Sequence, residues 1–556
     1  MSDSLRGADV LAASLARAGA RYLFSLSGNQ IMPVYDAALD AGLEIVHVRH
    51  EGAAVHMADA WGRLTEVPGV ALVTGGPGHA NAIGALYTAA AADSPLVLLS
   101  GHAPLAQLGM DAFQEMRQAD MAAPVVKASW TAQSAATLGA DIARAFRIAR
   151  SGRPGPVHLS LPFDVLEAKA SRSETAPPSA DAFLPSQQTL SAAVGGEVAA
   201  ELLRARRPLI IAGPMLTGMR GRTQREALAR ACGIPVLGME SPRGVNDPAL
   251  GAIAEVLKQA DLVLLLGKKL DFTLRFGRAP AFAPDCRFIQ IDPDEAVLAR
   301  AKHALGDPGR IAASVRADPI PALNCLAAMP IDGRGDAGWA SEVEAAVTFR
   351  PPAWALAGNR AQGPLHPAEV GRAVATALAK SPSHVVVIDG GEFGQWAQAC
   401  VDAPLRLING PAGSIGSALP FALAAKLAHP EATVAVLLGD GTFGFHMAEF
   451  DTAVRNKLAL VAIVGNDACW NAEHQIQLNS YGAARAVGCE LLPTRYDEVV
   501  EALGGHGELV QTSAELPAAL RRAFASGKPA CVNVMLERLA APNISRHASG
   551  APSTGH

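Results

Sequence analysis

Short apolar runs alternate with amphipathic stretches along most of the chain. In its first part, five such runs are YLFSLSG, EIVHVRHEG, GVALVTGGPG, PLVLLSGHAP and GPVHLSLP. Strands that are apolar throughout and separated by helical patterns indicate a parallel sheet covered on both faces. The pattern therefore predicts an α/β domain over residues 1–170.

The same alternation returns twice further along the chain. Residues 190–330 contain PLIIAG, IPVLG, LVLLLGKKL and RFIQID, and residues 366–540 contain VVVIDGGEFG, ATVAVLLGDG, LVAIVGND and PACVNVMLE. The segment KASRSETAPPSADAFLPSQQ predicts one linker, and a Pro/Gly-rich connection over about 330–365 predicts another. Residues 541–556 have the small, polar composition of a mobile tail. The chain is thus expected to form three α/β domains, each a mainly parallel sheet flanked by helices.

Composition narrows the class of protein. The chain has 556 residues, half of them hydrophobic, which allows about three domains with large cores. The net charge of −5 gives no general attraction to nucleic acid or to an anionic membrane. The N-terminus lacks the basic start and apolar run of a signal peptide, and no apolar run of ~18 residues follows, so a cytoplasmic protein is expected. Seven scattered cysteines without CxxC spacing argue against a disulfide framework or a zinc site.

Polar residues end two successive apolar strands in the third domain. Gly439-Asp440-Gly441 ends one strand and Asn466-Asp467 ends the next, and 467 − 440 gives 27 residues, enough for a crossover helix. Ligands of parallel sheets lie beyond these carboxyl ends. Oxygen donors there favour Mg²⁺, which usually takes further ligands from phosphate and water. An isolated GDG is most often only a turn, but the second motif favours a site.

This pair of motifs resembles the diphosphate-binding signature of thiamine diphosphate enzymes. The resemblance implies thiamine diphosphate and Mg²⁺ as cofactors, with Asp440, Asp467 and the main-chain carbonyl of Cys469 as metal ligands. The family usually has Asn where this chain has Asp467. Two carboxylates and a diphosphate exceed the charge of the metal, so the sequence leaves open a compensating donor or a shift of the ligand to Asn466.

A carboxyl group in the first domain fits the same family. Glu51, in VRHEGAA, follows an apolar strand and opens an Ala-rich helix, where it is either an ordinary helix N-terminal glutamate or a shielded acid. The downstream segments TGGPGHAN and GMDAFQE favour the second interpretation. Together the three segments resemble the pyrimidine-binding domain of the acetolactate synthase-like superfamily. In that family the carboxyl acts at a ring nitrogen of the cofactor.

The resemblance also assigns roles to other positions. The bulky Ile415 in NGPAGSIGSALP matches the residue that holds the cofactor in its bent shape, and the glycine amides of DGGEFGQW are expected to cradle its diphosphate. The implied catalytic residues are Glu51, Gln114, Asn29, Gln30 and Glu473, the last of which coincides with a glutamate of some 2-oxoacid decarboxylases. The implied cofactor-binding residues are Glu51, Gly76, Asn81, Gly390, Gly391, Glu392, Phe393, Ser414, Ile415, Gly439, Asp440, Gly441, Thr442 and Asn466.

The middle domain suggests the subclass. The segment GKKLDFTLRFGRAPAFAPDCRFIQIDPD resembles oxalyl-CoA decarboxylases and 2-hydroxyacyl-CoA lyases. It lacks the Arg-Phe-Asp-Asp pattern that lines the flavin site of acetolactate synthases, so ADP or coenzyme A is expected there and FAD is not. Cations for the phosphates of coenzyme A are Lys268, Lys269, Arg275 and Arg278. The alternative is a solvated basic face.

The sequence therefore predicts a 2-hydroxyacyl-CoA lyase that releases an aldehyde or ketone and formyl-CoA, and that catalyses the reverse condensation. Three alternatives stay open: an acetolactate synthase-like carboligase, a decarboxylase of oxalyl-CoA or a 2-oxoacid, and a relative without activity. The expected substrate is a small molecule, an acyl-CoA, with neither nucleic acid nor membrane as partner. Family members build the site between two chains, which implies a homo-oligomer, at least a dimer and commonly a tetramer.

Overall fold

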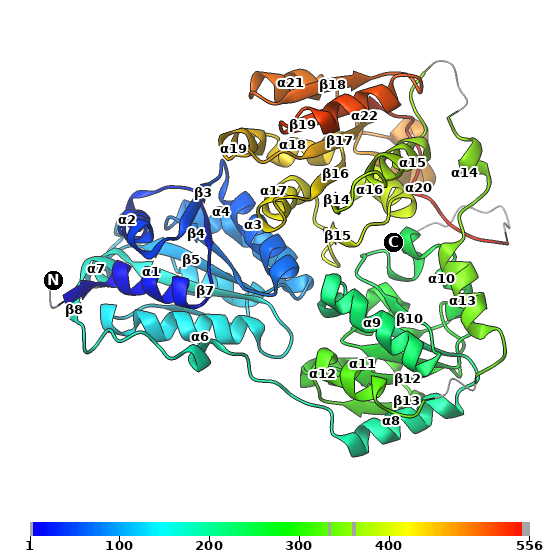
Figure 1. Ribbon diagram of the computed structural model, residues 1–556, viewed down its shortest axis with the longest axis horizontal. Helices are drawn as coiled ribbons and strands as arrows, with labels where there is room; N and C mark the ends of the chain where they lie inside the picture. The colour runs from blue at the N-terminus through cyan, green and yellow to red at the C-terminus, as the bar shows by residue number, and fades with distance from the viewer. Residues whose placement is uncertain (1–3, 332–334, 359–362, 548–556) are drawn as a thin grey trace. The chain divides into compact units, whose positions relative to one another are not determined.

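The computed structural model of this chain describes residues 4–331, 335–358 and 363–547. The ribbon in Figure 1 runs from blue at the N-terminus to red at the C-terminus. The chain forms two compact units. The first unit comprises Met1–Ser186, Leu419–Pro430 and His446–Leu458, and the second comprises Gln187–Ala418, Glu431–Phe445 and Ala459–His556.

The first unit contains a six-stranded parallel sheet of order β3-β2-β4-β5-β7-β6. Its strands are β2 (Tyr22–Ser25), β3 (Glu44–His47), β4 (Gly69–Val73), β5 (Leu96–His102), β6 (Ser129–Thr131) and β7 (Pro156–Pro162). Its helices are α1 (Gly7–Arg17), α2 (Met32–Ala41), α3 (Glu51–Thr65), α4 (Pro77–Ala91), α5 (Gln118–Ala122), α6 (Leu138–Arg150), α7 (Phe163–Glu167), α17 (Ala418–Ala428) and α19 (Glu449–Arg455). Helices α1 and α6 cover one face with buried side chains such as Leu11, Leu15, Ile142 and Phe146 (Figure 1). The β4 and β5 strands are buried along their whole length, as the apolar runs predict.

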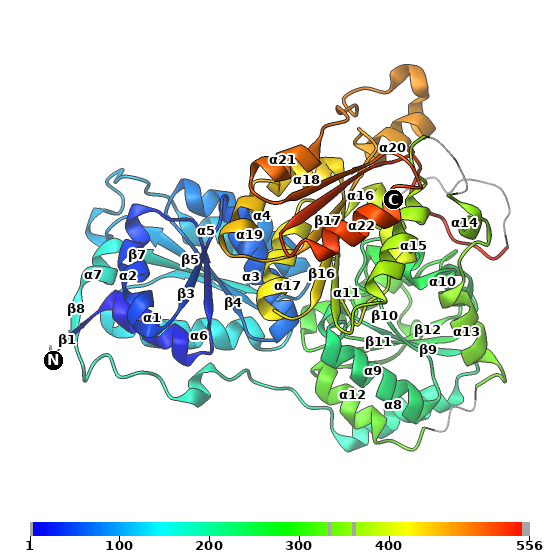
Figure 2. The ribbon, with the colours of Figure 1, turned by 45° about the horizontal axis from the view of Figure 1, so that its top comes forward.

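The second unit contains two parallel sheets, of which the middle one has the order β10-β9-β11-β12-β13 (Figure 2, green). Its strands are β9 (Pro208–Ala212), β10 (Val236–Gly238), β11 (Leu262–Leu266), β12 (Arg287–Ile291) and β13 (Ile311–Val315). Its helices are α8 (Ala192–Arg204), α9 (Met219–Cys232), α10 (Ile253–Leu257), α11 (Glu295–Leu305), α12 (Pro319–Ala327) and α13 (Trp339–Thr348). Leu262, Leu264 and Leu266 pack with α8, α9 and α12, whereas Val263 and Leu265 pack with α10, α11 and α13. The two-residue period of the strand thus supplies both cores.

The other sheet of the second unit has the order β15-β14-β16-β17-β19-β18 and is parallel throughout. Its strands are β14 (His384–Ile388), β15 (Leu405–Ile408), β16 (Thr433–Gly439), β17 (Val461–Asn466), β18 (His506–Val510) and β19 (Ala530–Met535). The helices associated with it are α14 (Ala353–Leu356), α15 (Pro367–Leu378), α16 (Gly391–Cys400), α18 (Asp440–His446), α20 (Asn471–Tyr481), α21 (Tyr496–Ala502) and α22 (Leu516–Ala525). In the β16–β17 register Gly439 lies opposite Gly465, so the two strands end side by side.

The prediction of three mainly parallel α/β sheets is confirmed. Two predicted connections carry more structure than expected. The first contains β8 (Lys169–Ser171), which pairs antiparallel with β1 (Ser4–Arg6). The second, over 330–365, contains α13, which buries Trp339, Val343 and Ala346.

The C-terminal segment is partly tied down. In residues 541–547, Ile544 is buried in the core with the middle sheet, and Arg546 pairs with Glu255 at 2.7 Å and Glu342 at 2.6 Å. Residues 548–556, predicted as the rest of a mobile tail, lie outside the described residues. All seven cysteines are free. Within the described ranges, no helix has the length and hydrophobicity that crossing a membrane requires.

Candidate active site

A cavity of about 320 Å³ opens at the carboxyl ends of β14, β16 and β17 in the second unit. Its walls also include Pro242, Arg243 and Asn246 after β10, Phe272 and Arg275 after β11, and the first turn of α20. Of the predicted cofactor-binding residues, the cavity walls bring together Gly390, Gly391, Glu392, Phe393, Ile415, Gly439, Asp440, Gly441 and Thr442. The folded chain thus gathers at one place most of the motifs that the sequence singled out in the third domain.

Two carboxylates lie side by side in this cavity. Asp440 opens α18 directly after β16 and is 2% exposed, and burial raises its pKa to about 6. Asp467 follows β17, and burial together with the neighbouring charge of Asp440 raises its pKa to about 7. The Asp440 Oδ2 atom is buried and has no hydrogen-bond partner in the described part of the protein. A buried, unpartnered carboxylate oxygen beside a second carboxylate is a site that a cation would stabilise.

The residues present fit a metal that shares its ligands with a phosphate group. Among the described residues, no cluster of three or more His, Cys, Asp or Glu could hold a metal by itself. The Asp440–Asp467 pair would therefore need further oxygen atoms, as Mg²⁺ bound to a phosphorylated ligand does. Cys469 lines the same cavity. Burial raises the pKa of its thiol to about 11, so the neutral side chain does not compete with the oxygen ligands.

Asn466 has a different task from Asp467. Its amide donates to the carbonyl of Thr494 at 3.0 Å and to Asn533 Oδ1 at 3.1 Å, and its own oxygen accepts from the Ala468 N–H at 3.2 Å. Asn466 does not line the cavity, whereas Asp467 does. This geometry favours Asp467 as the ligand and gives Asn466 the role of holding the turn.

Arg538 supplies a nearby cation that the sequence analysis did not identify. It donates to the main-chain carbonyls of Asp467 at 2.7 Å and Ala468 at 2.9 Å, and it pairs with Glu490. Its charge lowers the pKa of Asp467 against the larger effect of burial. Arg538 is therefore a compensating group of the kind that the extra carboxylate requires.

Asp389 ties the loop of Ile415 to the end of β14. This fully buried carboxylate accepts from the N–H groups of Gly390 at 2.7 Å, Gly416 at 3.0 Å and Ala418 at 3.2 Å. Burial raises its pKa to about 6, although these N–H groups oppose the rise. Asn409 adds a bond to the carbonyl of Ser414 at 2.8 Å. The side chain of Ile415 is thereby held at a fixed place in the cavity wall.

Glycines make room for these close approaches. A Cβ at Gly390 would lie 2.9 Å from Ile415 Cγ2, and one at Gly441 would lie 2.6 Å from the ring of Trp470. Gly391 has a φ of +82°, which few other residues adopt. The Gly390-Gly391 pair opens α16, a ten-residue helix whose N-terminus faces the cavity. Free N–H groups at such a helix end favour a phosphate or another anion.

Residues in the connecting segments of the middle domain line another part of the cavity wall. Arg243 lies 3.5 Å from Glu392 on α16, and Phe272 and Arg275 line the same wall. Phe272 is 50% exposed, and Arg275 has a φ of +47°. Glu473, in the first turn of α20, lies at the exposed side of the lining. The cavity therefore combines guanidinium groups, an aromatic ring and a carboxylate outside the proposed metal pair.

The four predicted coenzyme A cations are not gathered at one place. Lys268 is 2% exposed and donates to Thr273 Oγ1 at 2.7 Å, and Arg278 donates twice to the carbonyl of Ala304. Arg275 lines the cavity, whereas Lys268, Lys269 and Arg278 do not. Of the four, Arg275 has the position best suited to meet a substrate.

In the first unit, Glu51 begins α3 and is 8% exposed. Its Oε2 accepts a hydrogen bond from Asn81 Nδ2 at 3.0 Å, and its Oε1 would lie 3.3 Å from a Cβ at Gly78. The N-cap residue His50 accepts from the N–H of Gly52 at 3.0 Å, which fixes the start of the helix. The structure thus brings Glu51 and Asn81 together as a shielded, hydrogen-bonded acid.

The glycine loop after β4 is held by two glutamines. Gln30 accepts from the Gly75 N–H at 3.1 Å and from the hydroxyl of Thr74, and Gln118 accepts from the Gly76 N–H at 2.8 Å. Gln30 was predicted as a catalytic residue, whereas Gln118 was not predicted. No local motif marks Gln118, because its partners are distant in the chain.

Two other predicted residues differ in exposure. Gln114 has a φ of +59° and a buried Oε1 without a hydrogen-bond partner in the described structure, and its Cβ lies 2.9 Å from where a Cβ of Gly76 would be. Asn29 is exposed after β2. Gln114 thus lies against the glycine loop, whereas Asn29 faces solvent in the single chain.

Three parallel-sheet domains, a shielded acid and a carboxylate pair in a cavity with a glycine-rich helix start are the features that an enzyme with a diphosphate-bearing cofactor requires. Comparison with known families gives the class. Residues 5–121 match "Thiamine pyrophosphate enzyme, N-terminal TPP binding domain", residues 196–317 match its central domain, and residues 389–534 match its C-terminal TPP binding domain. The chain belongs to the thiamine pyrophosphate enzyme family, whose domains imply thiamine diphosphate as the cofactor.

Individual relatives extend over nearly the whole chain. A protein described as "Probable acetolactate synthase" from Mycobacterium bovis is 36% identical over 545 residues, covering 96% of both chains. "2-hydroxyacyl-CoA lyase" from Oryza sativa subsp. japonica is 30% identical over 572 residues, covering 97% of both. "2-hydroxyacyl-CoA lyase 2" from Homo sapiens is 29% identical over 593 residues, covering 96% of this chain and 90% of the relative. The names of these relatives thus describe two different activities.

Proposed function

We propose that this protein is a thiamine diphosphate- and Mg²⁺-dependent carbon–carbon lyase and carboligase acting on 2-hydroxyacyl-CoA. It would release an aldehyde or ketone and formyl-CoA, and it would catalyse the reverse condensation. The observation that supports the cofactor chemistry is the unpartnered Asp440 oxygen beside Asp467, in a cavity that the glycine-rich start of α16 also lines. The similarity to 2-hydroxyacyl-CoA lyases over the whole chain supports the choice of substrate.

Residues of both units would contribute to cofactor binding and catalysis. Asp440 and Asp467 would hold Mg²⁺, and the N–H groups of the first turn of α16, from Gly391 onward, would receive the diphosphate. The N–H of Gly390 is already donated to Asp389. When bound, thiamine diphosphate supplies an acidic carbon that adds to carbonyl groups. The Glu51 carboxyl, kept from water and oriented by Asn81, would exchange a proton with a ring nitrogen of the cofactor.

Substrate binding would involve side chains from the connecting segments of the middle domain. Arg243 and Arg275 offer positive charge and Phe272 offers an apolar face at the same cavity. An acyl-CoA has both anionic and apolar parts, which this combination can bind. Glu473 is placed at the exposed side, where it could exchange a proton with a substrate oxygen.

Replacing Arg275 with Gln is expected to raise the KM for the acyl-CoA about tenfold while the affinity for thiamine diphosphate stays unchanged. The reason is that this guanidinium lines the cavity from the middle domain, whereas the diphosphate would be held by Asp440, Asp467 and the start of α16. Steady-state kinetics with a parallel cofactor titration measures both quantities. Arg278→Gln is the matched control, because its guanidinium is bonded to Ala304 outside the cavity. Equal kinetics for the two variants would contradict the role of Arg275.

A second candidate is an acetolactate synthase-like carboligase, which the 36% identical mycobacterial relative favours. One pair of assays separates the candidates. The lyase proposal expects formyl-CoA from a 2-hydroxyacyl-CoA and no acetolactate from pyruvate, whereas the carboligase expects the opposite. Release of carbon dioxide from oxalyl-CoA, or from a 2-oxoacid without condensation, would instead indicate a decarboxylase.

Replacing Ile415 with Ala is expected to lower kcat about tenfold or more with little change in thiamine diphosphate affinity. Ile415 is held by the Asp389-tied loop against Gly390, where a smaller side chain would leave the cofactor less constrained. Ile415→Leu preserves the volume and should retain most of the activity. A loss of affinity without loss of kcat would show that Ile415 binds the cofactor and does not shape it.

We further propose that the working enzyme is a homo-oligomer in which Glu51 of one copy serves the cofactor held by a second copy. Mixing chains tests this directly. Chains with Glu51→Gln and chains with Asp440→Asn, each inactive alone, should regain activity when co-expressed, since one site of the mixed dimer then has both native residues. Absence of recovered activity in purified mixed dimers would contradict the proposal.

A further inference from the structure

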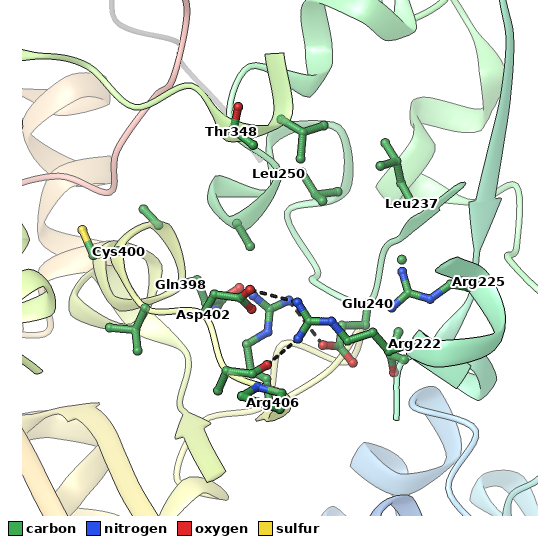
Figure 3. A pocket seen from close by; sticks show the side chains of 18 of the residues that line it. Arg222, Arg225, Leu237, Glu240, Leu250, Thr348, Gln398, Cys400, Asp402 and Arg406 are labelled. Carbon is green, nitrogen blue, oxygen red and sulfur yellow. Dashed lines mark hydrogen bonds and ion pairs between the residues drawn. The ribbon is translucent and has the colours of Figure 1, made fainter. Parts of the chain in front are cut away.

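A second and larger cavity, of about 580 Å³, lies in the same unit (Figure 3). Its walls come from α9, β10, the C-terminal end of α16 and the start of β15. It shares no lining residue with the candidate active site. Helix α16 contributes its N-terminal residues to the active-site cavity and its last residues to this one. The second cavity is within the size range of sites for small organic molecules.

Four arginines line this cavity. Two of them donate most of their hydrogen bonds to other residues of its walls. Arg222 donates to the carbonyl of Ala403 at 2.6 Å and to Asp402 at 2.9 Å. Arg350 donates to four main-chain carbonyls, those of Ala249, Val347, Phe349 and Ala399. These two guanidiniums connect the walls and have little capacity left for a ligand.

The other two arginines are less committed. Arg225 donates through Nε to the carbonyl of Leu216 at 2.9 Å, and its terminal nitrogens have no hydrogen-bond partner in the described part of the chain. Arg406 reaches Glu240 only at 3.5 Å. In Figure 3 the side chains of Arg222, Arg225 and Arg406 lie in the same part of the cavity, close to Glu240. Two cations with open donor positions are thus concentrated there.

The surroundings neutralise Arg225 only in part. Among the described residues no carboxylate pairs with it directly, since Asp402 pairs with Arg222 and Glu240 with Arg406. Burial lowers the pKa of Arg225, and the nearby charges of Glu240 and Glu226 only partly oppose this effect. Gly238 accommodates the guanidinium, since a Cβ there would lie 2.4 Å from Nη1. A cation enclosed at a cost and left with open donors is what an anion site requires.

The remaining walls set the shape of the ligand. Leu237, Leu250 and Thr348 lie on the side away from the Arg222 and Arg406 side chains (Figure 3). Gln398 is 2% exposed, and neither its amide nitrogen nor its amide oxygen has a hydrogen-bond partner within the described structure. The cavity therefore presents cations at one end, an apolar wall at the other and an uncommitted amide in its lining.

We propose that this cavity binds a small organic anion whose carboxylate or phosphate head pairs with Arg225 and Arg406 while a short apolar body packs on Leu237 and Leu250. The proposal goes beyond the catalytic function and does not depend on which reaction the enzyme catalyses. It assigns the cavity to a ligand other than thiamine diphosphate or the substrate.

Calorimetric titration of the enzyme saturated with thiamine diphosphate and Mg²⁺ tests the proposal. Saturation blocks the diphosphate site, so binding of a phosphate probe there is avoided. Butyl phosphate and pentanoate serve as probes, because they differ in the head group and carry similar apolar chains. At least one is expected to bind with a Kd of about 1 mM or tighter, and the stronger probe identifies the head group.

Arg225→Gln should weaken binding of that probe at least tenfold, and Arg225→Lys, which keeps the charge but loses the fork, at least threefold. Arg230→Gln, an exposed position on the same helix, is the matched control and should bind like the native enzyme. If Arg225→Gln does not fold, as its melting curve would show, the Arg225→Lys comparison decides. No binding of either probe up to ~10 mM, or equal binding by the foldable Arg225 variant and the control, would overturn the proposal.

Discussion

The Glu51→Gln variant is expected to lose activity by about 10²–10⁴-fold while it still binds thiamine diphosphate, the range that a positioned acid or base contributes to catalysis. Glutamine keeps the size of the side chain and can still hydrogen-bond with Asn81. It cannot exchange a proton as a carboxyl group does. The expected loss therefore lies in kcat and not in cofactor affinity.

Single-turnover kinetics and a cofactor titration on the same preparation measure the two effects. Exchange of the acidic proton of bound thiamine diphosphate, followed by NMR, should slow to a similar extent, which a merely structural defect would not produce. Glu44→Gln, at the exposed first residue of β3, is the control and should retain native kinetics. Native turnover in Glu51→Gln would remove this residue from the mechanism.

The Asp440→Asn variant is expected to bind thiamine diphosphate at least ~100-fold more weakly in the presence of Mg²⁺, because the metal loses a charged ligand. Glu431→Gln, an exposed position just before β16 and at its opposite end, is the matched control. Calorimetry over a range of metal concentrations would separate weaker metal binding from weaker diphosphate binding. Unchanged affinity in Asp440→Asn would contradict the metal site.

In the protein without cofactor, the same substitution is expected to preserve or raise thermal stability. Burial and the adjacent carboxylate raise the pKa values of Asp440 to about 6 and of Asp467 to about 7. Since a raised carboxyl pKa means that the ionised form destabilises the fold, this cost is present above these pKa values and disappears as the pH falls below them. Asp440→Asn should therefore melt at the same or a higher temperature than the native apoprotein at pH 8. A stable variant without cofactor binding would separate a lost site from a lost fold.

The sequence predicts the sheets well because their strands are buried on both faces. Strands such as β11 and β16 are apolar along nearly their whole length, so burial and sequence coincide. Helix α13 was not predicted because the sequence around it is rich in Pro and Gly. Its three buried side chains are buried only because the helix packs against the middle sheet. Local sequence predicts an element when its own hydrophobic pattern is clear. It does not predict an element whose burial depends on packing against distant parts of the chain.

The same distinction holds for the candidate active site. Asp440 and Asp467 are predictable because parallel neighbouring strands bring their carboxyl ends together. Arg538 and Gln118 are not, since each acts through main-chain groups that carry no side-chain signature. For Lys268 and Arg278, the sequence predicted a binding role that their positions in the fold do not support. Their charge suggested a ligand, but in the fold they hydrogen-bond to Thr273 and Ala304.

Binding of thiamine diphosphate to the purified, metal-free protein, measured by calorimetry with and without added Mg²⁺, tests the central claim most directly. We expect stoichiometric binding that requires the metal and that Asp440→Asn weakens at least ~100-fold. Absence of binding with Mg²⁺ present, or equal binding by native protein and Asp440→Asn, would contradict the proposed cofactor site.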